Sequence, residues 1–383
     1  MALCLAWAFG AFTPQGLAAA ETSEELRIFG YLTQAYGESS AGSIRGATEE
    51  GTTDLRNVAV QFRWEKSERD TVVVQLSHEK RGQAPFVPEG DEVEIDWAFY
   101  ELRIDEQSTL KVGRLNVPLG IYNEVRDVGT LLPFFDLPIS FYNGVLSSAE
   151  TVDGISISRT FAARSQWPLD AELYHGGWDT YQQQLNSEKK FNLESIEARA
   201  EDGLGLMLWL ETPISGLRLG AGRLNWRLDS PLNEPGTRER WESNHLSLDF
   251  TGERWMLRAE RRRWRFDQDF GAFLKLGFSL PARAQRDGFY AQLGRWLTPK
   301  IGLFGQYDEA KLKNNLGLLP DADDFHTARA LSLNYRVRPD LLVKIEYHDA
   351  DTRIPLGLPV SPMEGGQSPV NVTWTIASLS VSF

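Results

Sequence analysis

Residues 371–383 read NVTWTIASLSVSF, a stretch without a charged side chain that ends on Phe383. From Ala377 onward, apolar residues alternate with serines. Alternation with a period of two is typical of a β-strand that has one apolar and one polar face. A strand at the edge of a sheet leaves backbone groups unpaired unless another strand covers them. The stretch therefore predicts a last strand that pairs with the first one and closes the sheet.

Further segments upstream have the length and composition of strands, which makes sixteen in all. Long and short connections alternate between them without a break in the order, and the short ones, such as 67–69 and 298–299, are the size of tight turns. This pattern predicts an all-β fold, a 16-stranded antiparallel barrel with short turns at one end and long loops at the other. The predicted strands are 26–36, 54–66, 70–80, 93–105, 108–116, 151–161, 167–175, 203–211, 217–228, 242–250, 254–266, 287–297, 300–310, 324–337, 341–350 and 371–383.

The faces of these segments favour a barrel in lipid over a soluble sandwich, which also shows period-two alternation. In LLVKIEYH (341–348), aliphatic residues and a tyrosine point one way, and Lys344, Glu346 and His348 point the other. The segments are longer than the usual five or six residues. One face stays polar along almost every segment, as a water-filled interior allows. Because backbone groups in lipid must pair within the protein, such a sheet has to close.

Residues 1–20, MALCLAWAFGAFTPQGLAAA, are predicted to be a secretory signal peptide that is cleaved after Ala20. The alternative is a buried N-terminal helix. The only cysteine, Cys4, lies in this segment, so residues 21–383, the predicted barrel domain, contain no thiol. No later run of apolar residues is long enough for a transmembrane helix. The net charge of -13 and the pI near 5.0 argue against nucleic acid as a partner.

Together, the signal peptide, the sixteen strands, one outsized third long connection and the terminal phenylalanine resemble the bacterial outer-membrane porins. The stretch KVGRLNVPLGIYNE (111–124) is similar to the G-R-x-x-x-P-x-G segment of phosphate-selective-type porins, whereas the PEFGGD-like signature of enterobacterial general porins is absent. The resemblance implies an integral, multi-pass β-barrel of the bacterial outer membrane that lets small hydrophilic solutes and ions diffuse. It also implies a homotrimer in contact with lipid and lipopolysaccharide, and no cofactor.

The third long connection, 115–150, is long for a surface loop and too hydrophobic for one, with residues such as Leu132, Phe134 and Phe141. We expect it to fold inward and narrow the pore. Opposed charges on this loop and on the wall would then create a transverse field that favours polar solutes. In the alternative, each basic wall residue pairs with an acid of the lumen. The candidates are Glu124, Arg126, Asp127 and Asp136 on the loop, and Arg63, Arg103, Arg223, Arg227, Arg258, Arg262 and Lys344 on the wall.

Other groups of residues give weaker indications of function. Asp321, Asp323 and Asp324 are a weak calcium candidate, and a solvated acidic loop is the alternative. The histidines are scattered without an HExxH motif, and no GxSxG motif appears, so no catalytic residue and no enzyme activity is expected. The leading hypothesis is passive diffusion. The alternatives are a channel of the same fold that prefers phosphate, carboxylates or sugars, and a non-channel protein, either an outer-membrane hydrolase or an exported soluble β-protein.

Overall fold

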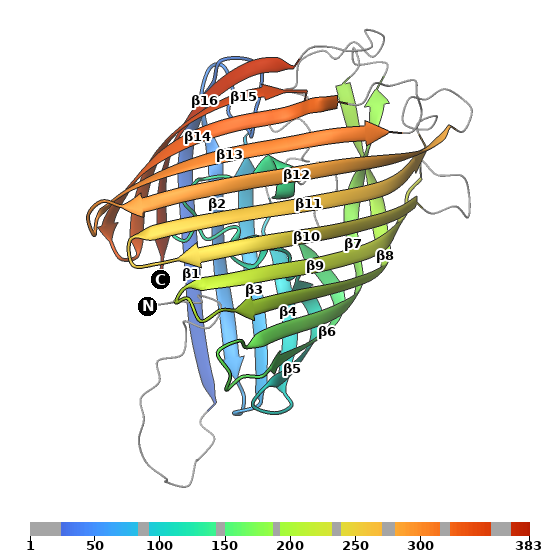
Figure 1. Cartoon of the computed structure of the whole chain (residues 1–383), viewed down its shortest axis with the longest axis vertical. Helices are drawn as coiled ribbons and strands as arrows, with labels where there is room; N and C mark the ends of the chain where they lie inside the picture. The colour runs from blue at the N-terminus through green and yellow to red at the C-terminus, as the bar shows by residue number, and fades with distance from the viewer. Residues whose placement is uncertain are drawn as a thin grey trace.

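The computed structural model describes residues 24–82, 92–142, 150–186, 192–231, 239–269, 280–314, 322–353 and 369–383. Sixteen antiparallel strands form one closed barrel in which each strand pairs with its neighbours in the chain (Figure 1). Two short helices, η1 (Asn123–Val125) and α1 (Ile139–Tyr142), lie between β5 and β6. The strands are β1 (Glu25–Ser39), β2 (Thr52–Glu65), β3 (Asp70–Arg81), β4 (Glu94–Arg103), β5 (Ser108–Asn116), β6 (Thr151–Phe161), β7 (Leu169–Asn186), β8 (Asn192–Glu211), β9 (Leu217–Asp229), β10 (Glu239–Thr251), β11 (Trp255–Asp269), β12 (Pro281–Trp296), β13 (Ile301–Asn314), β14 (Ala322–Arg338), β15 (Leu341–Thr352) and β16 (Val370–Ser382).

The barrel closes where β16 pairs with β1, as the sequence of the last strand predicted. The backbones of Gly30 and Phe383 exchange two hydrogen bonds, with N–O distances of 3.0 Å and 2.9 Å. A Cβ at Gly30 would lie 2.4 Å from the Phe383 ring, so only glycine allows the terminal ring to lie against β1. The closure removes both sheet edges and pairs the backbone of the last strand on both sides.

All sixteen predicted strands are confirmed, and several are longer than predicted at the long-loop end. The largest differences are in β7 and β8, which continue as a paired hairpin through a polar region that we expected to be a loop. In this region charged side chains such as Asp179 and Arg199 are exposed. Strands that project beyond lipid no longer need an apolar outer face, so period-two hydrophobicity fades although the strands continue.

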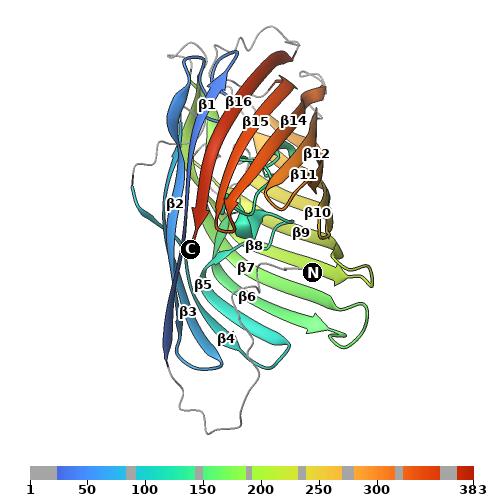
Figure 2. The same ribbon diagram turned by 90° about the vertical axis from the view of Figure 1, so that its left-hand side faces the viewer.

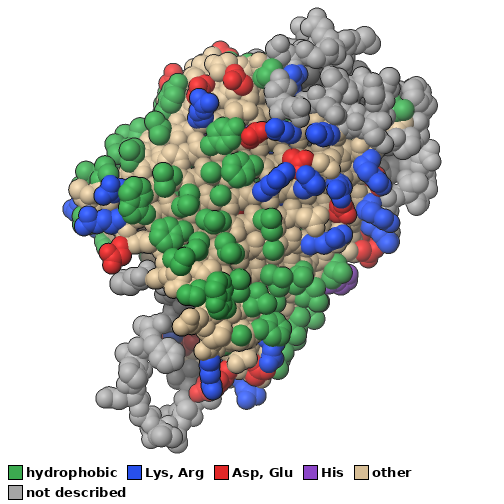
Figure 3. All heavy atoms as spheres, viewed as in Figure 1, with side chains coloured by type: hydrophobic (Ala, Val, Ile, Leu, Met, Phe, Trp, Pro, Cys, Tyr) green, Lys and Arg blue, Asp and Glu red, His purple; other side chains and the backbone are tan. Residues whose placement is uncertain are grey.

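The outer surface carries an apolar band, and the inner surface is mostly polar. Figure 3 shows apolar side chains spread over the wall, with basic side chains gathered toward the long-loop end. Exposed large side chains such as Leu257, Leu293, Leu333 and Ile345 form part of this band. A continuous exposed apolar surface of this extent matches a barrel wall that faces lipid. No helix in the described part of the chain is long and apolar enough to cross a bilayer.

The connection after β5 folds into the barrel, as predicted. Figure 2 shows the teal segment with α1 inside the wall of strands. We call residues 117–142 the inner loop; residues 143–149 of the predicted constriction segment lie outside the described residues. The first long connection also turns inward, and Arg45 forms an ion pair with Asp136 of the inner loop at 2.8 Å. The predicted signal peptide lies outside the described residues and stays a prediction.

Candidate functional site

Glu260 of β11 is the main attachment point of the inner loop. Its carboxylate accepts a hydrogen bond from the Ile121 amide at 3.1 Å and another from the Tyr142 hydroxyl. The hydroxyls of Ser247 and Tyr290, on the neighbouring wall strands, donate to the same carboxylate. A carboxylate with four donors is fully satisfied although it is almost completely buried. The two ends of the inner loop are therefore attached to one wall residue.

Helix α1 packs directly on the wall formed by β11, β12 and β13. The Ser140 amide donates to the Asp308 carboxylate at 3.2 Å, and Arg262 and Arg286 donate to carbonyl groups of α1. The Ser140 carbonyl oxygen lies 2.1 Å from where a Cβ of Gly288 would be, so this approach requires glycine. The helix is fixed to the wall by polar contacts at its start and at its end.

Further along the wall, β15 holds the middle of the inner loop. The Lys344 ammonium donates to the carbonyl oxygens of Phe134 at 3.1 Å and Gly129 at 3.2 Å. Next to it, the Phe135 amide donates to Glu346 at 2.7 Å. Lys344 has no exposed surface. The loop thus covers the wall from β11 to β15, and a hydrogen bond from Thr130 to Ser382 extends this contact to β16.

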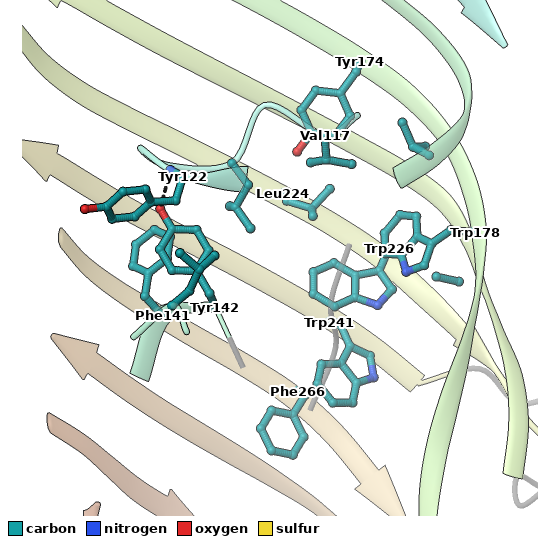
Figure 4. Packing of buried hydrophobic residues seen from close by; sticks show 14 of the residues in the cluster. Val117, Tyr122, Phe141, Tyr142, Tyr174, Trp178, Leu224, Trp226, Trp241 and Phe266 are labelled. Carbon is teal, nitrogen blue, oxygen red and sulfur yellow. Dashed lines mark hydrogen bonds between the residues drawn. The ribbon is translucent and has the colours of Figure 1, made fainter. Parts of the chain in front are cut away.

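Buried aromatic rings fill the space around the inner loop (Figure 4). One group consists of Tyr122, Phe141 and Tyr142 of the loop with Tyr290 of the wall. A second group runs along the wall toward the long-loop end in the order Trp178, Trp226, Trp241 and Phe266; the first two rings are tilted against each other, and the last three are stacked. The Trp241 and Phe266 ring centres are 4.4 Å apart with an interplanar angle of 10°. These apolar contacts hold the loop in one position within an otherwise polar interior.

The open side of the barrel is lined by charges of both signs. Glu124 of the inner loop is exposed to the passage, and Lys111 of β5, Glu172 of β7 and Arg218 of β9 lie within its electrostatic reach. The pKa of Glu124 is raised, because the protein surrounds it and Glu172 repels it, which outweighs the attraction of the two cations. A loop acid and two wall cations thus lie close enough inside the barrel to attract each other.

A second charged group lies where the loop returns to the β2–β4 wall. Asp127 accepts a hydrogen bond from the side-chain amide of Asn57 at 3.0 Å, and Arg126 forms an ion pair with Glu150 at 2.6 Å. Burial raises the pKa of Asp127 to about 8; Glu79 and Glu150 add to the shift, and Arg126 opposes it. Asp127 is therefore a loop carboxyl whose charge changes at mildly alkaline pH.

Two of the predicted basic wall residues lie inside the barrel in ion pairs with acids of the lumen. Arg63 pairs with Glu101 at 3.3 Å. Arg258 pairs with Asp249 at 2.9 Å and lies over the ring of Tyr122, 4.8 Å from its centre. This arrangement matches the alternative in which wall arginines pair with lumen acids.

The prediction that Arg223 and Arg227 face the lumen is wrong. Their neighbours Leu224, Trp226 and Leu228 are buried in the interior cluster, so both arginines point outward. There they pair with Glu242 at 3.6 Å and with Asp202 at 3.3 Å, respectively. The physical reason is that β9 projects beyond the apolar band, where its outer face is charged and its inner face packs on aromatic rings.

Other predicted site residues lie away from the open passage. Arg262 and Lys344 face inward, but the inner loop buries both, so they hold the loop rather than face solutes. Arg103 is the last residue of β4 and is exposed at the short-turn end. Asp136 pairs with Arg45 of the first long connection rather than with the wall.

The calcium candidate lies mostly outside what the structure shows. Asp321 is outside the described residues, and Asp323 and Asp324 belong to β14, but their side chains are not described. The described residues hold no group of histidine, cysteine or acidic side chains that would bind a metal ion.

Sequence reasoning missed the two cations that oppose Glu124. Strand alternation would have found both: Leu110 and Val112 flank Lys111, and Leu217 and Leu219 flank Arg218. The Trp178–Phe266 stack was also missed, because Trp178 falls in the polar part of β7 that we expected to be a loop.

The raised pKa of Asp127 predicts pH-dependent selectivity. As pH rises through about 8, this carboxyl gains a negative charge inside the barrel, so the preference for cations over anions should increase. Reversal potentials under a salt gradient, recorded over a series of pH values, measure this preference. The variant Asp127→Asn should lack the step, since an amide does not titrate. An identical step in both proteins would contradict the assignment to Asp127.

Comparisons with known proteins identify the fold. No protein-family model matches the sequence, and no curated protein matches it either. Solved structures do match. OmpF of Salmonella typhi, in complex with daunomycin, has a TM-score of 0.62 and 12% identity, with 94% of this chain and 98% of that chain covered.

Two further structures are matched over the whole of their own length. OmpT, expressed in the outer membrane of Vibrio cholerae, has a TM-score of 0.58 and 11% identity and covers 96% of this chain. The anion-selective porin from Comamonas acidovorans has a TM-score of 0.57 and 11% identity and covers 94% of this chain. OmpT has also been solved in a trimer form. With sixteen strands, end-to-end coverage and an inward-folded third connection, the chain has the fold of the 16-stranded porins.

Proposed function

We propose that the protein is an outer-membrane porin that lets small hydrophilic solutes and ions diffuse passively through a water-filled, charge-lined pore. The observation that carries the proposal is the position of the inner loop inside the barrel, attached to the wall at several points. Glu260, Asp308 and Lys344 fix the loop to the β11–β15 wall, and Asn57 of β2 holds Asp127, while Glu124 is exposed within electrostatic reach of charged residues of β5, β7 and β9. Such a loop narrows a wide barrel without filling it.

The mixed charges at the constriction favour polar solutes over apolar ones. Glu124 of the inner loop interacts with Lys111 and Arg218 of the wall, and Glu172 lies on β7 between the strands of these two cations, so a solute beside them experiences a field between the loop and the wall. Water and dipolar solutes align in such a field, whereas an apolar solute gains nothing to offset the loss of ordered water. We therefore propose transport by passive diffusion rather than enzyme chemistry, with no catalytic residue.

Uptake by proteoliposomes tests the proposed pore. Vesicles that contain the purified protein should swell in isotonic solutions of small sugars or amino acids, at rates that fall steeply as the solute becomes larger. Protein-free vesicles are the control. Absence of swelling with a correctly folded barrel would contradict the proposal.

The second candidate is a channel of the same fold that prefers one class of solute. For sugars, the feature to consider is the aromatic stack, because sugars bind to exposed aromatic rings. The rings of Trp226, Trp241 and Phe266 lie face to face and are at most 7% exposed. Sugars stack on free aromatic faces, but here the rings cover the faces of one another. This arrangement supports a structural role for the stack and favours general diffusion.

The outer surface supports a location among anionic lipids. Basic side chains point outward above the apolar band on β9 to β13, interleaved with fewer acids (Figure 3). Arginines and lysines at this level of a barrel would contact phosphate groups of lipopolysaccharide. A double variant Arg261→Glu, Arg263→Glu should co-purify with less lipopolysaccharide, and unchanged retention would contradict this. The basic residues are Arg223, Arg227, Arg240, Arg261, Arg263, Arg265, Arg283, Lys311 and Lys313.

We also propose a homotrimer, because OmpT of Vibrio cholerae has the same fold and has been solved as a trimer. The outer face of the closing strands β16 and β1 is apolar, with Leu26, Ile28 and Leu379 exposed. Sedimentation in density-matched detergent should give the mass of three chains. A monomer mass across the accessible protein concentrations would contradict the trimer.

A further inference from the structure

Two arginines and a tryptophan form a buried cluster on the wall side of the inner loop. Arg262 of β11 and Arg286 of β12 point into the barrel beneath α1 and are 2% and 1% exposed. Their guanidinium carbons lie 4.2 Å and 5.1 Å from the ring centre of Trp264, which is itself buried. We call these three side chains the arginine–tryptophan cluster.

Part of the hydrogen-bonding capacity of the cluster holds the inner loop. Arg262 donates to the Phe141 carbonyl at 2.9 Å and to the Ser243 hydroxyl at 2.7 Å. Arg286 donates to the Ile139 carbonyl at 3.0 Å. These bonds use only some of the available N–H groups, since each guanidinium carries five.

The remaining donors have no acceptor among the described residues. They are Nη2 of Arg262, Nε and Nη1 of Arg286, and Nε1 of Trp264, and each is buried. Buried donors normally find an acceptor, because an unpaired one loses its bonds to water without replacement. All four atoms are donors, and both arginines lie against the ring of Trp264. The cluster therefore matches a ligand that offers several acceptors at once.

The charge balance leads to the same conclusion. The two acids that attract the cluster electrostatically, Glu260 and Asp308, accept hydrogen bonds from other groups: Glu260 from Tyr142, Tyr290 and Ser247, and Asp308 from the Ser140 amide. In the described part of the chain, neither guanidinium of the cluster forms an ion pair with a carboxylate. Contact with the Trp264 ring compensates the two charges only in part. Glu260 and Asp308 attract the two buried guanidinium groups without direct contact, so the cost of burying both positive charges is offset only in part, and a bound anion would lower that cost.

We propose that the arginine–tryptophan cluster binds a small inorganic oxyanion of the phosphate or sulfate class. Such an anion offers several acceptor oxygens and negative charge, and the planar guanidinium group matches its geometry. Because the same arginines hold the carbonyl groups of Phe141 and Ile139, the bound anion strengthens the attachment of the inner loop to the wall. The site lies behind the loop, so the inference does not depend on solute passage through the pore.

Thermal unfolding of the folded, detergent-solubilised protein tests the proposal. Sodium phosphate is titrated in place of sodium chloride at constant ionic strength. The unfolding midpoint should rise by a few degrees and then saturate, as expected for a ligand that binds only the folded state. Arg286→Gln should abolish the rise. The matched control is Arg265→Gln, an exposed arginine on the outer face of β11, which should respond as the wild type does.

Two further measurements test the proposal if Arg286→Gln does not fold. The first is the titration of the wild type by itself: if its unfolding midpoint shows no saturable difference between phosphate and chloride, the proposal is overturned. Trp264→Phe removes one donor and keeps an aromatic ring, so it should fold and bind phosphate more weakly. A phosphate response in Trp264→Phe or Arg286→Gln equal to that of the wild type would also overturn the proposal.

Discussion

Replacement of Glu260 by alanine is expected to loosen the inner loop on the wall while the barrel stays closed. The carboxylate accepts hydrogen bonds from Ile121 and Tyr142 of the loop and from Ser247 and Tyr290 of the wall. Removing it leaves four buried donors without an acceptor, which should lower the free energy of unfolding by about 3 to 5 kcal/mol. The strand pairing does not involve this side chain. Denaturant unfolding in detergent measures the loss, and single-channel recordings should show larger and noisier currents.

The control for this variant is Glu242→Ala on the neighbouring strand β10. Glu242 points outward and forms ion pairs with Arg265 at 3.0 Å and Arg223 at 3.6 Å. Exposed ion pairs of this kind contribute about 0 to 1 kcal/mol, so this variant should be close to the wild type in stability and in current noise. Equal effects of the two variants would contradict the role given to Glu260.

Deletion of residues 124–142 should raise single-channel conductance several-fold. The deleted segment contains Glu124 and α1, and with them the part of the inner loop that extends from the constriction to the β11–β15 wall. Without it, a barrel of sixteen strands has a lumen too wide for its wall side chains to fill. Cation preference should also change, because Glu124 and Asp127 are lost together.

The deletion variant has to be shown to form a barrel before its conductance is interpreted. Circular dichroism should report β-structure like that of the wild type, and electrophoretic mobility should still change on heating. Lower stability is expected, since Tyr122 and the wall residue Tyr290 lose aromatic neighbours. An intact barrel with unchanged conductance would rule out the inner loop as the constriction.

Strand positions were predictable because lipid imposes a simple rule on side chains. Between the membrane surfaces, outward residues are apolar and inward residues are polar, so β5 and β6 have the same bounds in the sequence analysis as in the structure. Outside lipid the rule no longer applies. On β9 it inverts, because Leu224 and Trp226 pack inside the barrel while Arg223 and Arg227 meet solvent and acids outside.

The candidate site was less predictable, because alternation shows whether a side chain points into the barrel but not whether another part of the chain buries it there. Arg262 and Lys344 point inward as expected, yet the inner loop buries them. The wall contacts of the loop depend on groups far apart in sequence, such as Ile121 with Glu260 and Phe134 with Lys344. No local pattern encodes such pairs, since the partners are 139 and 210 positions apart in the chain.

The central claim is that this barrel encloses a water-filled pore that the inner loop narrows. Single-channel recording of the refolded protein in a planar bilayer, under a salt gradient, tests it most directly. We expect discrete conductance steps, grouped in threes for a trimer, with a conductance that grows with salt concentration and a reversal potential that shifts with pH through Asp127. Electrical silence from protein that inserts and keeps heat-modifiable mobility would contradict it.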